Sequence, residues 1–191
     1  MQSTDATINP STEILIAENI KVLREAQKLL ERMDDRLYTK IDSPTFTSSI
    51  GAQLRHCLDF YQCFLLGVKN GKVDYDQRER DELTEQQRTH AIERITMTTE
   101  MLWKLSLTEE QAMLWVKQDS PYWSTSSLRR ELQFLLSHLV HHQALVAVML
   151  RLQGFAPDEE IGVAPATLAH RRERNLFGVL RQRQPRLSVV L

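Results

Sequence analysis

Apolar side chains recur every three or four residues along most of this chain, which is the repeat of one face of an α-helix. The repeat occurs in four separate segments, and the stretches between them carry no convincing strand-type alternation. In the first segment it runs through Ile16, Ile20, Leu23, Leu30 and Leu37. Because each apolar stripe has to be covered by other helices, we predict an all-α fold in which four helices form a bundle.

Capping and terminating residues mark the ends of these segments. Ser and Thr side chains accept hydrogen bonds from the first free amides of a helix, and Gly often follows its last turn. The predicted helices run from Ser11 or Thr12 to about Tyr38, from Ser48 or Ser49 to about Lys69, from Thr84 to about Leu105, and from Ser126 or Ser127 to Gln153. The second helix is predicted to end at Asn70-Gly71 and the fourth at Gly154.

The connections between the helices differ in character. Pro44 ends a short linker after the first helix. Residues 71–81, GKVDYDQRERD, are too polar and too rich in charge for a core element, so we predict a structured loop there. Residues 107–125 are predicted to form a short irregular, extended excursion before the fourth helix. Residues 169–191 are predicted to be a basic C-terminal tail, since they hold six Arg and one Glu, and residues 1–191 together form one domain.

Composition excludes several classes of protein. A length of 191 residues suffices for a real core, and a net charge of −1 provides no overall attraction to nucleic acid or to an anionic membrane. The start, MQSTDATINPSTEI, lacks a basic stretch followed by an apolar run, and no stretch reaches the roughly 20 apolar residues of a spanning helix. We therefore expect a cytoplasmic protein. Cys57 and Cys63 are six residues apart in one helix, a separation of about 9 Å that prevents their pairing.

A pair of histidines in the fourth helix is the most informative feature of the sequence. His138 and His142 fall on the stripe predicted to face the bundle, together with Leu135, Leu145, Met149 and Leu152. A spacing of four residues places two imidazoles one turn apart and about 40° apart around the axis, so that both can converge on one cation. His141 points about 100° away from His142 and is predicted to flank the site.

A third ligand has to come from another helix, because two imidazoles hold a divalent ion weakly. His56 in LRHCLDF of the second helix is the candidate, with Gln53 and Phe60 on its side of the helix. Asp59, one turn later, could orient the ring or enter the coordination shell. Hydrogen-bonded, non-ligating histidines remain the alternative, and His90 and His170, which lie among polar residues, are expected to have no site role.

Two stretches resemble a known family. The segment SIGAQLRHCLDF, followed by RRELQFLLSHLVHHQALVAVMLRLQG, is similar to the DinB-like or YfiT-like superfamily of metal-dependent enzymes over about residues 11–168. The resemblance implies an up-down-down-up bundle in which a lone His, here His56, and a His-x-x-x-His pair, here His138 and His142, bind one divalent ion. VDYDQRERD and GVAPATL resemble a branch of the family without an assigned reaction. The chain departs from many members at Gln143-Ala144-Leu145, where those members carry Arg-Gly-Gln.

Three neutral imidazoles leave at least one coordination position of a divalent ion open, as in catalytic sites. Zinc is the preferred ion, with nickel, iron and manganese as alternatives. The expected function is metal-activated water or thiol chemistry, as a hydrolase or a thiol-dependent transferase, on a small substrate that could include a low-molecular-weight thiol. The alternative is a non-enzymatic module, stabilised by metal, that serves binding or the stress response. The oligomeric state is left open, with a homodimer as one alternative.

Three further residues are candidates for catalysis. Asp59 and Glu131 carry carboxylates, and Glu131 lies one heptad before His138, where it could act as a general base. Its alternative role is that of a first-turn carboxylate favoured by the helix dipole. Arg78, with Arg80, could bind a substrate carboxylate, although a solvated cluster of ion pairs is the commoner role for such arginines.

Overall fold

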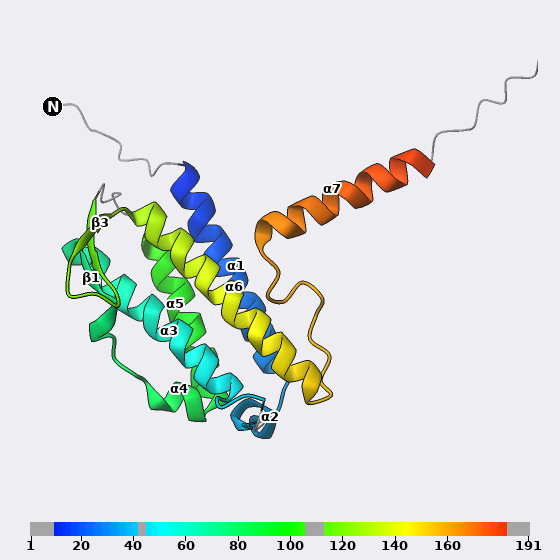
Figure 1. Ribbon diagram of the computed structural model, residues 1–191, viewed down its shortest axis with the longest axis horizontal. Helices are drawn as coiled ribbons and strands as arrows, with labels where there is room; N and C mark the ends of the chain where they lie inside the picture. Colours follow the sequence, from blue (N-terminus) through cyan, green and yellow to red (C-terminus); the bar gives the residue numbers. More distant parts are fainter. Residues whose placement is uncertain (1–9, 42–44, 106–112, 183–191) are drawn as a thin grey trace, which may run out of the picture.

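The computed structural model describes residues 10–41, 45–105 and 113–182. Within this part of the chain, four long helices form the body of the protein (Figure 1). They are α1 (Pro10–Glu31), α3 (Ile50–Gly67), α5 (Arg88–Leu105) and α6 (Leu128–Leu152). Helix α1 packs against α5 and α6, and α3 packs against the same two helices. The prediction of a mainly helical protein is confirmed, and the apolar faces of these helices enclose the core.

The predicted ends of α3 and α6 are confirmed. Ser49 caps α3 by accepting a hydrogen bond from the amide of Ala52 at 3.0 Å. Ser127 caps α6 by accepting one from the amide of Arg130 at 3.3 Å. A 3-10 turn, η1 (Val68–Asn70), continues α3, and the glycines that follow at 71 and 154 have φ of 69° and 80°. That left-handed backbone suits Gly and ends each helix.

The first helix differs from its prediction at both ends. It begins at Pro10, so Ser11 lies inside it and does not cap it. It ends at Glu31 because Asp34 caps a separate short helix, α2 (Asp35–Thr39), by accepting a hydrogen bond from the amide of Leu37 at 2.7 Å. The same correction applies to Thr12, which lies inside α1 and is fully buried. The linker proline at position 44 lies outside the described residues.

The third predicted helix is interrupted near its start. Asp81, not Thr84, is the capping residue, and its carboxylate accepts from the amides of Leu83 and Thr84 at the start of α4 (Glu82–Gln86). The backbone is extended at Gln87, with φ of −125° and ψ of 107°, before α5 begins. Helix α4 lies directly against α3 at Gly51, which has no side chain and so permits this approach. A Cβ atom there would clash with the carbonyl oxygen of Glu85.

A small three-stranded sheet is present in the described residues and was not predicted. Strand β1 (Lys72–Asp74) pairs in parallel with β2 (Leu114–Lys117), which pairs antiparallel with β3 (Ser124–Ser126). A 3-10 turn, η2 (Tyr75–Gln77), follows β1. The side chains of Val73, Tyr75 and Leu114 are fully buried. The prediction of a polar loop at 71–81 is therefore wrong for its first half.

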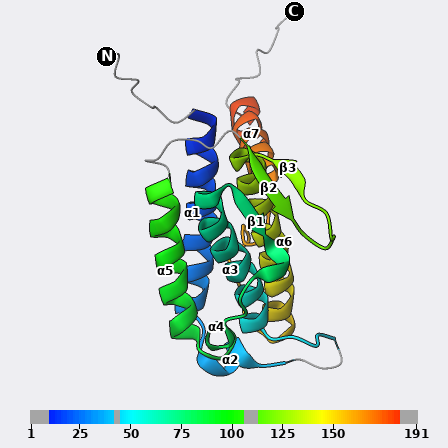
Figure 2. The same cartoon turned by 90° about the vertical axis from the view of Figure 1, so that its left-hand side faces the viewer.

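The excursion before the fourth helix is extended, as predicted, over residues 113–126, whereas residues 106–112 lie outside the described chain. Its two strands are regular and were predicted to be irregular. Strand β2 gains its parallel partner from residues about forty positions earlier in the chain, and β3 then pairs with β2. Figure 2 shows the sheet on the side of the bundle where α3 and α6 lie, away from α5.

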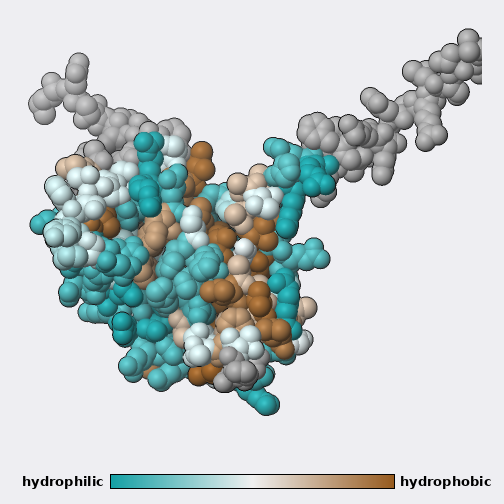
Figure 3. Space-filling model, in the orientation of Figure 1, coloured by the Kyte–Doolittle hydropathy of each residue, from teal (hydrophilic) through white to brown (hydrophobic). Residues whose placement is uncertain are grey.

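Helix α6 carries the predicted apolar stripe along most of its length. Leu135 and Met149 are fully buried, but Leu152 is 57% exposed and Val148 46% exposed. Apolar side chains accordingly gather on the surface over the C-terminal half of α6 (Figure 3). The inward placement predicted for Leu152 is wrong, because Gly154 ends the helix there and the chain turns away.

By length and composition alone, α6 is long and apolar enough to cross a membrane, although Gln133, His138 and Gln143 interrupt its apolar residues, as the sequence indicated. The core helix of a soluble protein passes the same test, and α6 packs against α1 and α3. The predicted basic tail, residues 169–191, overlaps α7 (Pro165–Gln182), a helix that leads away from the bundle (Figure 1).

One buried amide joins three of the four long helices. Asn19 of α1 is fully buried, and its Nδ2 donates to the carbonyl oxygens of Leu15, at 2.8 Å, and of Leu132 in α6, at 3.1 Å. Its Oδ1 accepts from the hydroxyl of Tyr61 in α3 at 2.6 Å. All of these polar atoms are satisfied only while the three helices keep their relative positions.

We expect Asn19→Ala to lower the free energy of unfolding by roughly 2–4 kcal/mol, because it leaves the Tyr61 hydroxyl and the Leu132 carbonyl without their partner. Tyr61→Phe should cost less, since it leaves only one acceptor unpaired. Gln27→Ala, which removes a surface hydrogen bond to Glu31, should change the value by less than about 0.5 kcal/mol. Urea unfolding measures all three, and an Asn19 variant as stable as the Gln27 variant would contradict the assignment.

Candidate metal centre

The contact between α3 and α6 brings together the three histidines that the sequence singles out. The Nε2 atom of His138 lies 3.1 Å from Nε2 of His56 and 3.1 Å from Nε2 of His142. One ring nitrogen from each residue lies within 4.8 Å of those of the other two. Among the described residues, these histidines form a group of ligand-type side chains that could hold a metal ion.

The spacing of these nitrogens fits a shared cation. Two imidazole nitrogens at 2.0–2.1 Å from a tetrahedral zinc ion lie roughly 3.3 Å apart, close to the distances between these rings. Hydrogen bonds among the rings cannot satisfy the group equally well, because a neutral imidazole has one donor and one acceptor nitrogen. Three Nε2 atoms that converge on one place therefore match the donor set of a divalent ion.

The surroundings keep all three imidazoles neutral. Burial is the main reason that the pKa of His138 falls to about 3 and that of His142 to about 4. Burial also lowers the pKa of His56, and the positive charges of Arg78 and Arg55 add to this effect. Only a neutral imidazole offers a lone pair to a metal, so the ligands are in the required state at neutral pH.

Gln53 controls the orientation of His142, a role that sequence reasoning missed. Its Oε1 accepts a hydrogen bond from Nδ1 of His142 at 2.6 Å, while its Nε2 donates to the hydroxyl of Ser48 at 2.7 Å. With the proton of neutral His142 held on Nδ1, the lone pair of Nε2 points toward the cluster. The signal available beforehand was the position of Gln53, three residues before His56 on the same helix.

Aromatic rings line the cluster on one side. Phe60 lies with its ring centroid 5.0 Å from that of His56 and 4.6 Å from that of His138. Phe134 stacks on His138 at 5.6 Å with an interplanar angle of 9°, and Tyr75 stacks on Phe60 at 5.1 Å. The spacing by four residues from His56 to Phe60 and from Phe134 to His138 was the signal for this wall. The rings pack against the imidazoles and restrict their planes on that side.

Asp59 is not part of the imidazole cluster. Its carboxylate accepts a hydrogen bond from Arg94 of α5 at 3.1 Å and lies 3.7 Å from Nη1 of Arg55. Burial raises the pKa of Asp59, and the hydrogen bond from Arg94 opposes that rise. The predicted contact with His56 is therefore absent from the described structure, and Asp59 joins α3 to α5 instead. The reason is that Arg94, from a distant segment, is a stronger partner than an imidazole.

Glu131 is buried, and both of its carboxylate oxygens are occupied. Oε2 accepts from the hydroxyl of Tyr75 at 2.9 Å, and Oε1 accepts from Ser126 at 2.5 Å. These bonds tie the turn after β1 and the end of β3 to the first turn of α6. The geometry therefore favours a structural role for Glu131, one heptad away from His138, over the general base that the sequence suggested.

Arg78 lies beside the aromatic wall. Its Nη1 donates to the carbonyl oxygen of Tyr75 at 2.7 Å, and its guanidinium carbon lies 4.6 Å from the centroid of the Phe60 ring. Arg80 is exposed, as is His141, whose ring lies 5.2 Å from that of His142. His90 bonds to the Asp81 carboxylate at 2.9 Å, outside the cluster.

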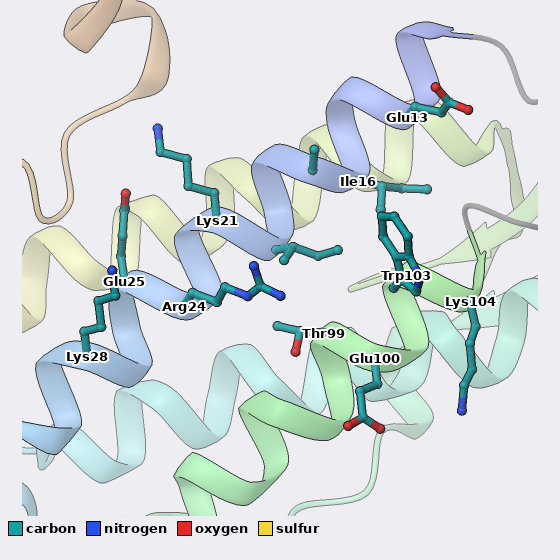
Figure 4. Close-up of a pocket in the computed structure, with 12 residues that line it drawn as sticks. Glu13, Ile16, Lys21, Arg24, Glu25, Lys28, Thr99, Glu100, Trp103 and Lys104 are labelled. Carbon is teal, nitrogen blue, oxygen red and sulfur yellow. The ribbon is translucent and has the colours of Figure 1, made fainter.

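A groove of about 1020 Å³ lies between α1 and α5 (Figure 4). Ile16 and Ile20 of α1 and Thr99 and Trp103 of α5 contribute to its walls. The groove is formed by α1 and α5, whereas the imidazole cluster is formed by α3 and α6. The two therefore lie on different sides of the bundle. The groove therefore contributes nothing to the geometry of the three histidines.

The low pKa values of the imidazoles predict an acid-sensitive metal-free protein. In the unfolded chain each His takes up a proton near its ordinary pKa of 6.5, whereas folded His138 and His142 resist protonation down to about 3 and 4. The unfolded state then binds more protons, so the free energy of unfolding should fall as pH drops from 6.5 toward 4. Urea unfolding of the metal-free protein at pH 7 and pH 5 measures this. In His138→Gln the fall should be smaller, and equal falls in both proteins would count against the assignment.

The comparison with known families was positive over most of the chain. The model of the DinB family matches residues 7–166. The matched stretch includes the three clustered histidines, the wall of aromatic rings and the turn that carries Arg78. No protein with a curated description matches the chain.

Proposed function

The chain belongs to the DinB family, and from this membership and its three-imidazole cluster we propose that it is a divalent-metal-dependent enzyme acting on a small substrate. The observation that carries the proposal is the convergence of three Nε2 atoms from α3 and α6, two of them 3.1 Å from the third. Such a neutral, three-nitrogen donor set is typical of catalytic metal sites.

The residues of the chain have distinct tasks in this proposal. His56, His138 and His142 would hold the ion, and Gln53 aims the lone pair of His142 at it. Zinc is the preferred ion because imidazole nitrogen and a four-coordinate geometry suit it, with nickel, iron and manganese as alternatives. When bound, the ion would lower the pKa of a coordinated water or thiol, which supports either hydrolysis or thiol-dependent transfer.

The position of Asp59 favours an open site over a closed, structural one. A fourth protein ligand would close a tetrahedral site, and among the described residues Asp59 is bound instead to Arg94 at 3.1 Å. One coordination position is then left for a water or a substrate atom. The alternative is a non-enzymatic module, stabilised by metal, that serves binding or the stress response. It is less well supported, because no fourth ligand from the described residues closes the site.

We extend the proposal to the order of the helices, up-down-down-up. The course of the chain supports it: α3 and α5 both start near the end of the bundle where α2 and α4 lie, and α1 and α6 start at the other end (Figure 2). The cytoplasmic location and the homodimer remain predictions from the sequence alone.

We expect the protein to bind about one divalent ion per chain, and His56→Ala, His138→Ala or His142→Ala to remove most of it. Elemental analysis of protein purified without chelators and without an affinity tag measures the occupancy. His141→Ala is the matched control, because it removes a neighbouring exposed imidazole and should leave the metal in place. Full occupancy in the three ligand variants would disprove the assignment.

Gln53→Ala should weaken metal binding by roughly 10–100-fold, because His142 loses the acceptor that holds its proton on Nδ1. Gln53→Glu keeps an acceptor at that place and should retain more of the affinity. Competition with a chromogenic chelator gives the dissociation constants. An unchanged affinity in Gln53→Ala would show that the hydrogen bond has no effect on the ligand.

A further inference from the structure

We propose that this site takes a small molecule that carries a carboxylate, with Arg78 as the residue that binds the carboxylate. The inference rests on the proposed function, because it assumes that another group of the same small molecule, such as a thiol, binds the metal ion at the imidazole cluster. It is carried by the position of the Arg78 guanidinium beside the wall of the cluster and by the absence of a described carboxylate within the cluster.

The charges around the cluster favour an anion. Asp59 and Glu131 are the acidic residues that the sequence placed near the imidazoles, and each is bound to other partners. The charges of Arg78, Arg55 and Arg80 all act on His56. Glu85 at 2.8 Å and Asp59 at 3.7 Å offset the charge of Arg55, whereas the ion pairs of the described residues include neither Arg78 nor Arg80. A divalent cation held by neutral imidazoles adds two further positive charges. A monoanionic or dianionic ligand would therefore be stabilised here.

Arg78 is fixed in place but retains free donors. The bond from its Nη1 to the Tyr75 carbonyl and its position 4.6 Å above the Phe60 ring restrict the guanidinium to one place. Phe60 in turn touches His56 and His138, so one ring separates the guanidinium from the cluster. A guanidinium has five N–H donors, and the hydrogen bond to Tyr75 uses only one nitrogen. The remaining edge can bind a carboxylate through two parallel hydrogen bonds.

A second cation extends the same surface. The guanidinium carbon of Arg130 lies 5.9 Å from the centroid of Phe134, and Phe134 stacks on His138. Two arginines thus lie over the two phenylalanine rings that border the cluster. The ligand that this arrangement favours has a donor such as a thiol or hydroxyl at one end and a carboxylate at the other.

The test uses the cobalt-loaded protein and two small thiols, mercaptoacetate and 2-mercaptoethanol, followed by the absorption bands of cobalt. Arg78→Gln should weaken mercaptoacetate by about 10–100-fold, the range expected for a charge-assisted hydrogen bond, and 2-mercaptoethanol by less than about twofold. Arg80→Gln is the matched control, since it removes the same charge from the exposed neighbour and should affect both thiols alike. Arg78→Lys should restore part of the mercaptoacetate affinity. Equal losses for the two thiols in Arg78→Gln would overturn the inference.

A second measurement separates this inference from the proposed function. In the metal-free protein, acetate should shift the NMR signal of the Arg78 Nε–H group and leave that of Arg80 unshifted. If cobalt fails to bind the histidines but acetate still shifts Arg78, the proposed function is wrong and the carboxylate site stands. If cobalt binds and acetate leaves Arg78 unshifted, the carboxylate site is wrong and the metal-dependent function stands.

Discussion

The contact between α3 and α6 places three imidazole rings where burial disfavours their charged form. Each ring then needs a partner for its lone pair, and the three nitrogens meet within a few ångströms of one another. The other features of this side of the protein follow from that constraint. Gln53 holds a proton away from the cluster, aromatic rings pack against one side of it, and the charges of nearby arginines act on His56. The three imidazoles themselves are neutral, so the cluster gains charge only when a cation binds to it.

The sequence was sufficient for the parts that depend on local rules. The caps of α3 and α6 were predictable because Ser49 and Ser127 act on amides three residues ahead of them. The histidines were also predictable, since a spacing of four within a helix sets the relation of His138 to His142 whatever the tertiary structure. Only the choice of His56 needed a long-range assumption, that the second helix packs against the fourth, and the resemblance to a family supported it.

The errors arose where partners come from distant segments or where two local rules compete. Asp34 and Asp81 interrupt continuous helical repeats because a short carboxylate captures free amides as effectively as another helical turn would. Asp59 bonds to Arg94, 35 residues later, and Glu131 bonds to Tyr75, 56 residues earlier. No periodicity within a helix indicates such pairs. The sheet escaped prediction for the same reason, since Val73 becomes a core residue only when β2 covers it.

The parallel pairing of β1 with β2 has a consequence for the order in which the protein assembles. Lys72 of β1 pairs with Trp115 of β2, and the whole of α5 lies between these two residues in the sequence. Closing so long a loop is entropically costly, so these strands should join after the neighbouring helices have packed. The same short strands should then be the first to separate in native-state fluctuations. Since the turn with Tyr75 and Arg78 follows β1 directly, we expect the part of the candidate metal centre that holds Arg78 to be more mobile than the helices that hold the histidines.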